Sequence, residues 1–161
     1  MKTSFSHMDE QGRAQMVDVG GKPPMRRTAV ARGQFVAAPT TLDRLLGEGG
    51  AEPLPKGEAL AVARVAGISA AKRTGDLIPL CHPLPLDHVM IDFERTSEDR
   101  LTVTASASIT AKTGIEMEAL TAVSLACLTL YDMTKAVDKR LRIENIHLIE
   151  KRKEPVVPSS D

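Results

Sequence analysis

Apolar residues are most concentrated in residues 112–139, KTGIEMEALTAVSLACLTLYDMTKAVDK. From Ala119 to Tyr131 only two threonines and a serine interrupt the apolar run, so a helix formed here is apolar on nearly every face. Such a helix is buried on all sides. Thr113 and Glu116 have the T-x-x-E spacing of a capping box, which predicts the start of the helix. We expect the rest of the fold to pack around this helix.

Two further helices are predicted in the first half of the chain. Residues 58–74 are rich in alanine and contain no proline, and Gly67 indicates a close approach to a neighbouring element. Residues 42–46 form a short helix that ends at Gly47. Either of the two threonines before this helix could serve as its N-cap, because a threonine hydroxyl can accept a hydrogen bond from the first turn.

Four segments show strand patterns. The clearest alternates apolar and polar residues from Leu101 to Thr110, which is the period of a strand with one buried face. Gly33 interrupts the first segment, where we expect a break in the strand. The predicted strands are residues 28–38, 89–94, 101–110 and 141–151.

The order of these elements predicts the fold. Strand, helices, strand, strand, helix and strand match the split β-α-β-β-α-β plan, a ferredoxin-like α+β fold with an antiparallel sheet and helices packed on one face. Residues 1–27 predict an irregular N-terminal arm, residues 28–152 a single α+β domain, and residues 153–161 a disordered C-terminal tail. This fold hosts many unrelated functions, so the fold alone indicates none.

The composition argues against several classes of protein. Lys and Arg together number 21, as do Asp and Glu, so no overall field attracts nucleic acid or an anionic membrane. Aromatic residues are 2% of the chain, too few to stack the bases of a single strand. No apolar run is long enough for a membrane span, and the two cysteines lack a second cluster that would complete a zinc site. We therefore expect a cytoplasmic protein with free thiols.

A proline-rich segment follows the second helix. Residues 76–88, DLIPLCHPLPLDH, contain three prolines, which exclude a helix and predict a stiff, extended backbone. This backbone presents Cys81 and His82 among apolar neighbours. The segment could form the wall of a ligand site, or it could be a buried loop whose histidine is hydrogen-bonded within the protein; the residues alone leave both interpretations open.

Charged residues gather at the end of the central helix. Asp132 and Lys135 are three residues apart, so their side chains share one face. In the simpler interpretation they are a solvated ion pair of little energetic value. The helix and its terminal charges alone therefore identify no function.

Three segments of the chain resemble the MoaC family of cyclic pyranopterin monophosphate synthases. The similar segments are MVDVGGK, VARVAGISAAKRTGDLIPLCHPLPL and KTGIEMEALTAVSLACLTLYDMTKAVDK, and the resemblance covers roughly residues 7–152. Gly75 stands where the family often has a bulky aromatic residue, and Thr134 replaces a frequent cysteine. Neither difference changes a charged residue of the expected site.

The resemblance implies a reaction of molybdenum-cofactor biosynthesis. A cyclised dihydro-GTP is rearranged to cyclic pyranopterin monophosphate with release of pyrophosphate, which makes the enzyme a lyase acting on a phosphorus–oxygen bond. Such a rearrangement needs proton transfers and cations that bind phosphate, but no redox cofactor. Magnesium could accompany the triphosphate. The resemblance also implies a homohexamer built as a trimer of dimers, without a nucleic-acid or membrane partner.

The resemblance assigns roles to individual residues. Asp132 becomes the general base, Lys135 the general acid and base, and Lys56 a second candidate acid. Lys135 would then need a lowered pKa to exchange protons near neutral pH. The residues implied for substrate binding are Leu80, Cys81, His82, Glu116, Met117, Glu118, Arg27 and Lys151. No residue is expected to hold a metal ion.

Ferredoxin-like folds also include two other classes of function, a nucleotide-binding module and an RNA-binding sheet. A non-catalytic ferredoxin-like module that binds nucleotides needs the phosphate-binding cations but no paired Asp132 and Lys135, and it releases no pyrophosphate. An RNA-binding sheet is disfavoured because the predicted strands lack stacking aromatic residues.

Overall fold

The computed structural model describes residues 8–9 and 11–156 and is built on one four-stranded antiparallel sheet. The strands lie in the order β2-β3-β1-β4, which is the ferredoxin-like arrangement that the element order predicts. Their bounds are β1 Met25–Val36, β2 His88–Ser97, β3 Arg100–Ala111 and β4 Arg142–Pro155. The α+β class and the antiparallel sheet are thus confirmed.

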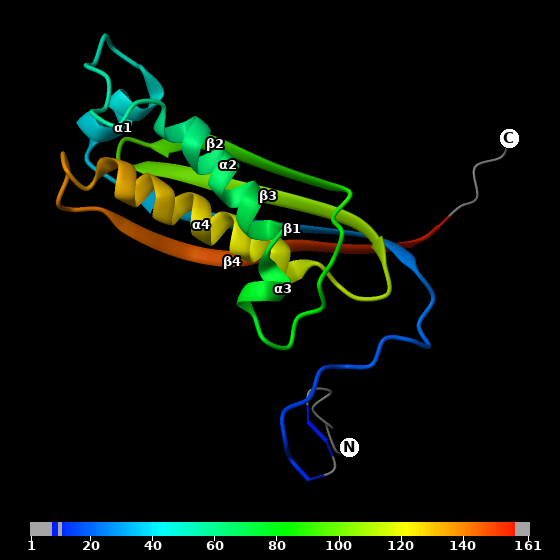
Figure 1. Ribbon diagram of the computed structural model, residues 1–161. Helices are drawn as coiled ribbons and strands as arrows, with labels where there is room; N and C mark the ends of the chain where they lie inside the picture. The colour runs from blue at the N-terminus through cyan, green and yellow to red at the C-terminus, as the bar shows by residue number, and fades with distance from the viewer. Residues whose placement is uncertain (1–7, 10, 157–161) are drawn as a thin grey trace, which may run out of the picture.

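The helices divide between one face of the sheet and its ends. The long helices α2 (Ala59–Ala71) and α4 (Glu116–Thr134) pack on each other and on one face of the sheet (Figure 1). The short helices α1 (Pro39–Leu46) and α3 (Thr74–Leu77) lie at opposite ends, α1 beside the C-terminal end of α4 and α3 beside its N-terminal end. Among the described residues, no helix is long and apolar enough to cross a membrane.

The core lies between the sheet and α4. Alternate residues of β1 and β3 point toward the helices and are buried, as the period-two pattern predicts. Many of these side chains are small, which lets α4 lie close to the sheet. The buried strand residues on this side are Ala29, Ala31, Phe35, Leu101, Val103, Ala105, Ala107 and Ile109.

Two glycines mark the closest contacts of the helices. A Cβ atom at Gly33 would lie 2.8 Å from Cγ1 of Val123 on α4, so the glycine is needed for that contact. The strand does not break there as expected: β1 continues past Gly33, and only its pairing with β4 shifts register. At Gly67 on α2, a Cβ would lie 2.8 Å from the carbonyl oxygen of Ala122 and 2.3 Å from Cδ1 of Ile91. This confirms the predicted close approach.

The predicted capping box at the start of α4 is wrong. The helix begins at Glu116 with Ile115 as its N-cap, and no side chain caps it. The Glu116 carboxylate instead forms an ion pair with Lys151 on β4. Because the helix starts at Glu116, this side chain stands at the first helical position and not at the third, where a capping box needs it.

The N-terminus of α1 also differs from the prediction. The helix starts at Pro39, earlier than expected, and neither threonine is its N-cap. Asp138, which follows α4, accepts hydrogen bonds from the Ala38 amide (2.6 Å) and from the Thr41 hydroxyl (3.1 Å). A carboxylate distant in sequence therefore does the capping, and local spacing could not reveal it. The end at Gly47, with φ of 68°, is confirmed.

The helix predicted over residues 58–74 is shorter than expected. It ends at Ala71, and a separate turn, α3, includes Gly75. From Ile78 to Asp87 the structure has no helix or strand, as the prolines predict.

The first and last strands extend beyond their predicted ends. Met25–Arg27 belong to β1 and pair with Lys153–Pro155 of β4, so the sheet begins before residue 28 and continues beyond residue 152. Residues 157–161 of the predicted tail lie outside the described residues.

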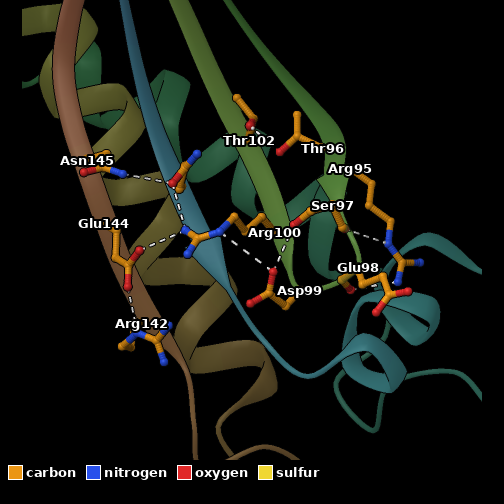
Figure 2. A network of polar contacts seen from close by, with 11 residues as sticks. Arg95, Thr96, Ser97, Glu98, Asp99, Arg100, Thr102, Arg142, Glu144 and Asn145 are labelled. Atoms are coloured by element: carbon orange, nitrogen blue, oxygen red, sulfur yellow. Dashed lines mark hydrogen bonds and ion pairs between the residues drawn. The ribbon is translucent and has the colours of Figure 1, made fainter.

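Arginine contacts connect the strand ends that lie far from the predicted binding residues. Nη1 of Arg100 on β3 donates to Gln34 on β1 (3.0 Å) and pairs with Glu144 on β4 (2.9 Å), so it joins three strands (Figure 2). Such charge-assisted bonds are stronger than neutral ones and fix the strand ends relative to one another.

We predict that Gly67→Ala destabilises the protein. The added methyl group meets the backbone of α4, which cannot move without loss of core packing, so the free energy of unfolding should fall by about 1–3 kcal/mol. Urea denaturation measures this change. Gly21→Ala is the control, because its Cβ would meet nothing within 4 Å. Equal stabilities of Gly67→Ala and wild type would contradict the close packing of α2 on α4.

Candidate functional site

A pocket of about 450 Å³ opens at the N-terminal end of α4. It brings together all eight residues that the sequence implied for substrate binding, from segments far apart in the chain. The lining residues are Val17, Lys22, Arg27, Leu80, Cys81, His82, Leu84, Lys112, Thr113, Gly114, Glu116, Met117, Glu118 and Lys151.

The sheet positions two cations of the pocket. Arg27 on β1 and Lys151 on β4 lie on adjacent strands and face the helix side of the sheet. Arg27 is oriented by its hydrogen bonds to the carbonyl oxygens of Ala111 (3.0 Å) and Lys112 (3.3 Å). Lys151 is held by its ion pair with Glu116. Both groups therefore have fixed positions at the pocket wall.

The N-terminal arm forms another wall. Nε2 of His82 lies 3.0 Å from the carbonyl oxygen of Val17, and Nζ of Lys112 donates to the carbonyl oxygen of Gly20 (2.8 Å). The proline-rich segment thus presents Cys81 and His82 to a pocket, and His82 is also hydrogen-bonded within the protein. Both interpretations of that segment hold in part.

Lys112 and Lys22 are pocket residues that the sequence analysis did not assign. With Arg27 and Lys151 they make four cations around one cavity. Lys22 lies in the arm motif MVDVGGK, and Lys112 directly precedes the predicted helix start. Each lysine stands close to a glycine in the sequence, but only the fold shows that both line one pocket.

The carboxylates of the pocket have opposite electrostatic environments. Glu118 is 3% exposed, and burial, together with the nearby Glu116 charge, raises its pKa. Burial alone would raise the pKa of Glu116 too, but the Lys151 hydrogen bond and charge outweigh it and lower that pKa. Burial and the Glu118 charge raise the pKa of the Cys81 thiol. At neutral pH Cys81 is therefore a thiol, while Glu116 is a carboxylate.

The proposed catalytic residues form a second cluster at the opposite end of α4. Asp132 Oδ1 pairs with Lys135 Nζ (2.6 Å), and Asp132 Oδ2 pairs with Lys56 Nζ (2.8 Å). Lys56 also donates to the carbonyl oxygen of Asp132 (2.9 Å). The loop before α2 supplies Lys56, and the last turn of α4 supplies the other two residues.

In this second cluster the pKa of Lys135 is shifted in the opposite direction from the one that its expected role requires. The Lys135 hydrogen bond, then that from Lys56, lowers the pKa of Asp132 to about 2. The Asp132 carboxylate in turn raises the pKa of Lys135, so the expected lowering is wrong for the single chain. The side chains of Lys135 and Asp132 are 56% and 55% exposed, so burial has little influence on them.

The structure does not bring the two clusters together. Glu118 and Asp132 belong to one continuous helix and are separated by roughly 21 Å at 1.5 Å per residue. One end of α4 therefore carries the pocket, and the other carries the Asp132–Lys135–Lys56 cluster.

Comparison with known proteins identifies the family. The model of the MoaC family matches residues 16–154. The chain belongs to the MoaC family. Both clusters lie within the matched region. The matches to three relatives cover most of this chain and most of each relative.

Three curated relatives show how similar the MoaC-family members are to this chain. A protein of Desulforapulum autotrophicum is 52% identical over 150 residues, which cover 92% of the chain and 90% of the relative. One of Novosphingobium aromaticivorans is 56% identical over 148 residues (92% and 91%), and one of Chloroflexus aggregans is 55% identical over 149 residues (92% and 88%). Each relative carries the name cyclic pyranopterin monophosphate synthase.

We predict that Glu118→Gln raises the melting temperature at neutral pH. The raised pKa means that the folded state disfavours the Glu118 carboxylate, so this cost exists above the folded pKa and disappears as the pH falls toward 4.5. The amide keeps the shape and removes the charge. The difference between variant and wild type should therefore shrink as the pH is lowered.

Thermal unfolding followed across this pH range measures the difference. Glu94→Gln is the matched control, because Glu94 is exposed on β2. A Glu118→Gln variant that is less stable than wild type at neutral pH would show that the carboxylate is favourably placed in the fold.

Proposed function

We propose that this chain is a cyclic pyranopterin monophosphate synthase acting in molybdenum-cofactor biosynthesis. It would convert a cyclised dihydro-GTP to cyclic pyranopterin monophosphate and pyrophosphate. The observation that carries the proposal is the single pocket lined by all eight implied binding residues. Its mixture of cations and carboxylates suits a ligand with a polar ring at one side and phosphates at the other.

The binding groups divide by their chemistry. Glu118, Glu116 and His82 offer hydrogen bonds to a guanine-derived ring, and Cys81 and Met117 lie beside them. The cations Arg27 and Lys151, joined by Lys22 and Lys112, suit the triphosphate, Arg27 through its fork of donors and the lysines as point charges. Among the described residues, no group of three or more His, Cys, Asp or Glu is placed to hold a metal ion. Magnesium that accompanies the substrate would be coordinated by its phosphates.

The second cluster supplies the proton transfers. At neutral pH Asp132 is ionised and Lys135 carries a proton, so the pair is ready to donate a proton but poor at accepting one. Lys56 is a second ammonium on the same carboxylate. Burial of this exposed cluster, or a further cation beside it, would lower the pKa of Lys135 and allow it to exchange protons near neutral pH. We infer that the cluster is completed only when substrate and a second subunit cover it.

A shared site explains how both ends of α4 can act on one substrate. An antiparallel α4 of a partner subunit would bring the pocket of one chain to the catalytic cluster of the other. The competing explanation is an extended triphosphate that spans the gap within one chain. Exposed apolar side chains on α2 and α4, Val65 (64% exposed) and Leu128 (53%), support a covered surface and hence a homo-oligomer. We propose that this oligomer is the hexamer that the resemblance implies.

We predict that Asp132→Asn and Lys135→Ala each lose at least about a hundredfold of kcat, the scale of general acid–base catalysis. Both side chains are exposed at a helix end, so the fold should persist. Pyrophosphate release from the cyclised substrate measures turnover, and circular dichroism measures the fold. A folded variant that retains near-normal release would refute the catalytic role of the substituted residue.

The same assay separates the enzyme from the binding module. A nucleotide-binding module retains the cyclised triphosphate without releasing pyrophosphate. Tight binding without pyrophosphate release by the wild-type protein would therefore favour the module.

We predict that inactive subunits complement each other. Glu118→Gln subunits and Lys135→Ala subunits, unfolded together and reassembled, should regain about a quarter of wild-type activity, because half of random dimers are mixed and each has one intact site. The control combines wild-type subunits with a double variant carrying both substitutions. In its mixed dimers, a shared site leaves no intact site, whereas a site within one chain leaves one. Mixed oligomers of the first kind that stay inactive, with activity in those of the second, would overturn the shared site.

A further inference from the structure

Lys56 is carried by a loop without helix or strand, in which the Ala51 amide donates to Glu48 (3.0 Å) and the Gly57 amide to Leu54 (3.0 Å). Residues 47–58 connect α1 to α2, and four glycines in this loop have positive φ, at positions 47, 49, 50 and 57. Leu54 is its one buried side chain. Glycines in this conformation leave a chain many alternative states when it is not anchored. Contacts from outside the loop therefore add to these turns in fixing the place of the Lys56 ammonium.

Arg44 on α1 makes such contacts at the point where the loop turns toward Lys56. Its Nε donates to the carbonyl oxygen of Glu52 (2.8 Å), and its Nη2 donates to the carbonyl oxygen of Pro53 (2.8 Å). One planar guanidinium therefore holds two successive carbonyl groups, three and four residues before Lys56. A lysine at this position could not hold both in the same geometry, because its single ammonium lacks the fork.

The Arg44 contacts complete a chain of contacts that begins at Asp138, just after α4, and ends at Asp132 in its last turn. Asp138, six residues after Asp132, caps α1 through the Ala38 amide and the Thr41 hydroxyl, which fixes α1 to the end of α4. Arg44 projects from α1 and fixes the loop. The loop then places Lys56 on Asp132.

A second arginine strengthens the base of the same loop. Nη1 of Arg95, at the end of β2, pairs with Asp43 on α1 (2.7 Å) and with Glu48 at the start of the loop (2.6 Å). Figure 2 shows the Arg95 guanidinium beyond the strand end, where its Nη2 also donates to the carbonyl oxygen of Glu98. These contacts fix α1 and the loop entrance, but they lie eight residues before Lys56. Of the two arginines, Arg44 holds the loop closer to Lys56.

We propose that Arg44 is a positioning residue that holds the loop so that the Lys56 ammonium rests on Asp132. The inference deepens the proposed function, since it concerns the residue assigned there as a second acid. Arg44 lies outside the pocket lining and the Asp132–Lys135–Lys56 cluster and acts through Lys56 alone.

The first test measures the geometry without any turnover. Wild type, Arg44→Gln, Arg44→Lys and the surface control Arg73→Gln are exposed to an amine-acylating reagent, and the labelling rate of Lys56 is followed by peptide mass spectrometry. Arg44→Gln should raise that rate about threefold, as expected when an exposed ion pair is lost. Arg44→Lys should raise it as well, because one ammonium cannot bridge both carbonyl groups. Asp132→Asn, which removes the partner charge, marks the size of the full effect.

The second test separates positioning from binding and from folding. Arg44→Gln should lower kcat about tenfold to a hundredfold, the cost of misplacing a catalytic group by about 1 Å. Its KM should stay within about twofold of wild type, because the pocket residues are untouched. Arg73→Gln should leave both constants and the melting temperature unchanged.

Two outcomes would overturn the proposal. The first is an unchanged labelling rate of Lys56 in Arg44→Gln when Asp132→Asn raises it. The second is an equal effect of Arg73→Gln, which would mean that loss of any surface charge suffices. Failure of the proposed function is seen separately: if Lys56→Ala keeps wild-type pyrophosphate release, Lys56 is not a catalytic acid, while the labelling rates still decide whether Arg44 fixes its position.

Discussion

The close packing of α4 on the sheet determines where every functional residue lies. Small side chains on β1 and β3, together with Gly33, let the helix lie against the strands, and Gly67 lets α2 lie against the helix. Because α4 is rigid and 19 residues long, its two ends are held apart at a fixed distance. The N-terminal end completes the pocket with Arg27 and Lys151, and the C-terminal end carries Asp132. Packing thus fixes the pocket and the Asp132–Lys135–Lys56 cluster at opposite ends of one helix.

The charged groups at the two ends of α4 differ in burial and in protonation. The pocket combines cations with a buried carboxylate, Glu118, whose pKa is raised. The exposed cluster at the other end keeps Asp132 ionised and Lys135 protonated. The first arrangement suits recognition, because its groups are held by neighbouring strands. The second is too exposed for burial to lower the pKa of Lys135. We propose that contact with a second subunit supplies that burial.

Local sequence patterns predicted the helices and strands that depend on interactions between near neighbours in the chain. Alternation along residues 101–110 gave β3, the apolar run after Ala119 gave α4, and the prolines excluded a helix after Leu77. The failures arise where a distant charged group replaces a local one. Glu116 stands at the first helical position of α4 and pairs with Lys151 on β4, and Asp138 caps α1 in place of the adjacent threonines. Lys112 was missed as a pocket residue because only the fold brings it beside Arg27.

We propose that one substrate joins the pocket of one chain to the Asp132–Lys135–Lys56 cluster of another. The most direct measurement is a crystal structure of the oligomer with the cyclised triphosphate trapped in an Asp132→Asn variant. A shared site places the ring beside Glu118 and His82, the phosphates on Arg27 and Lys151, and the partner subunit's Lys135 within hydrogen-bond distance of the ligand. A ligand that contacts Lys135 and Glu118 of the same chain, or that contacts no residue of a partner subunit, would contradict it.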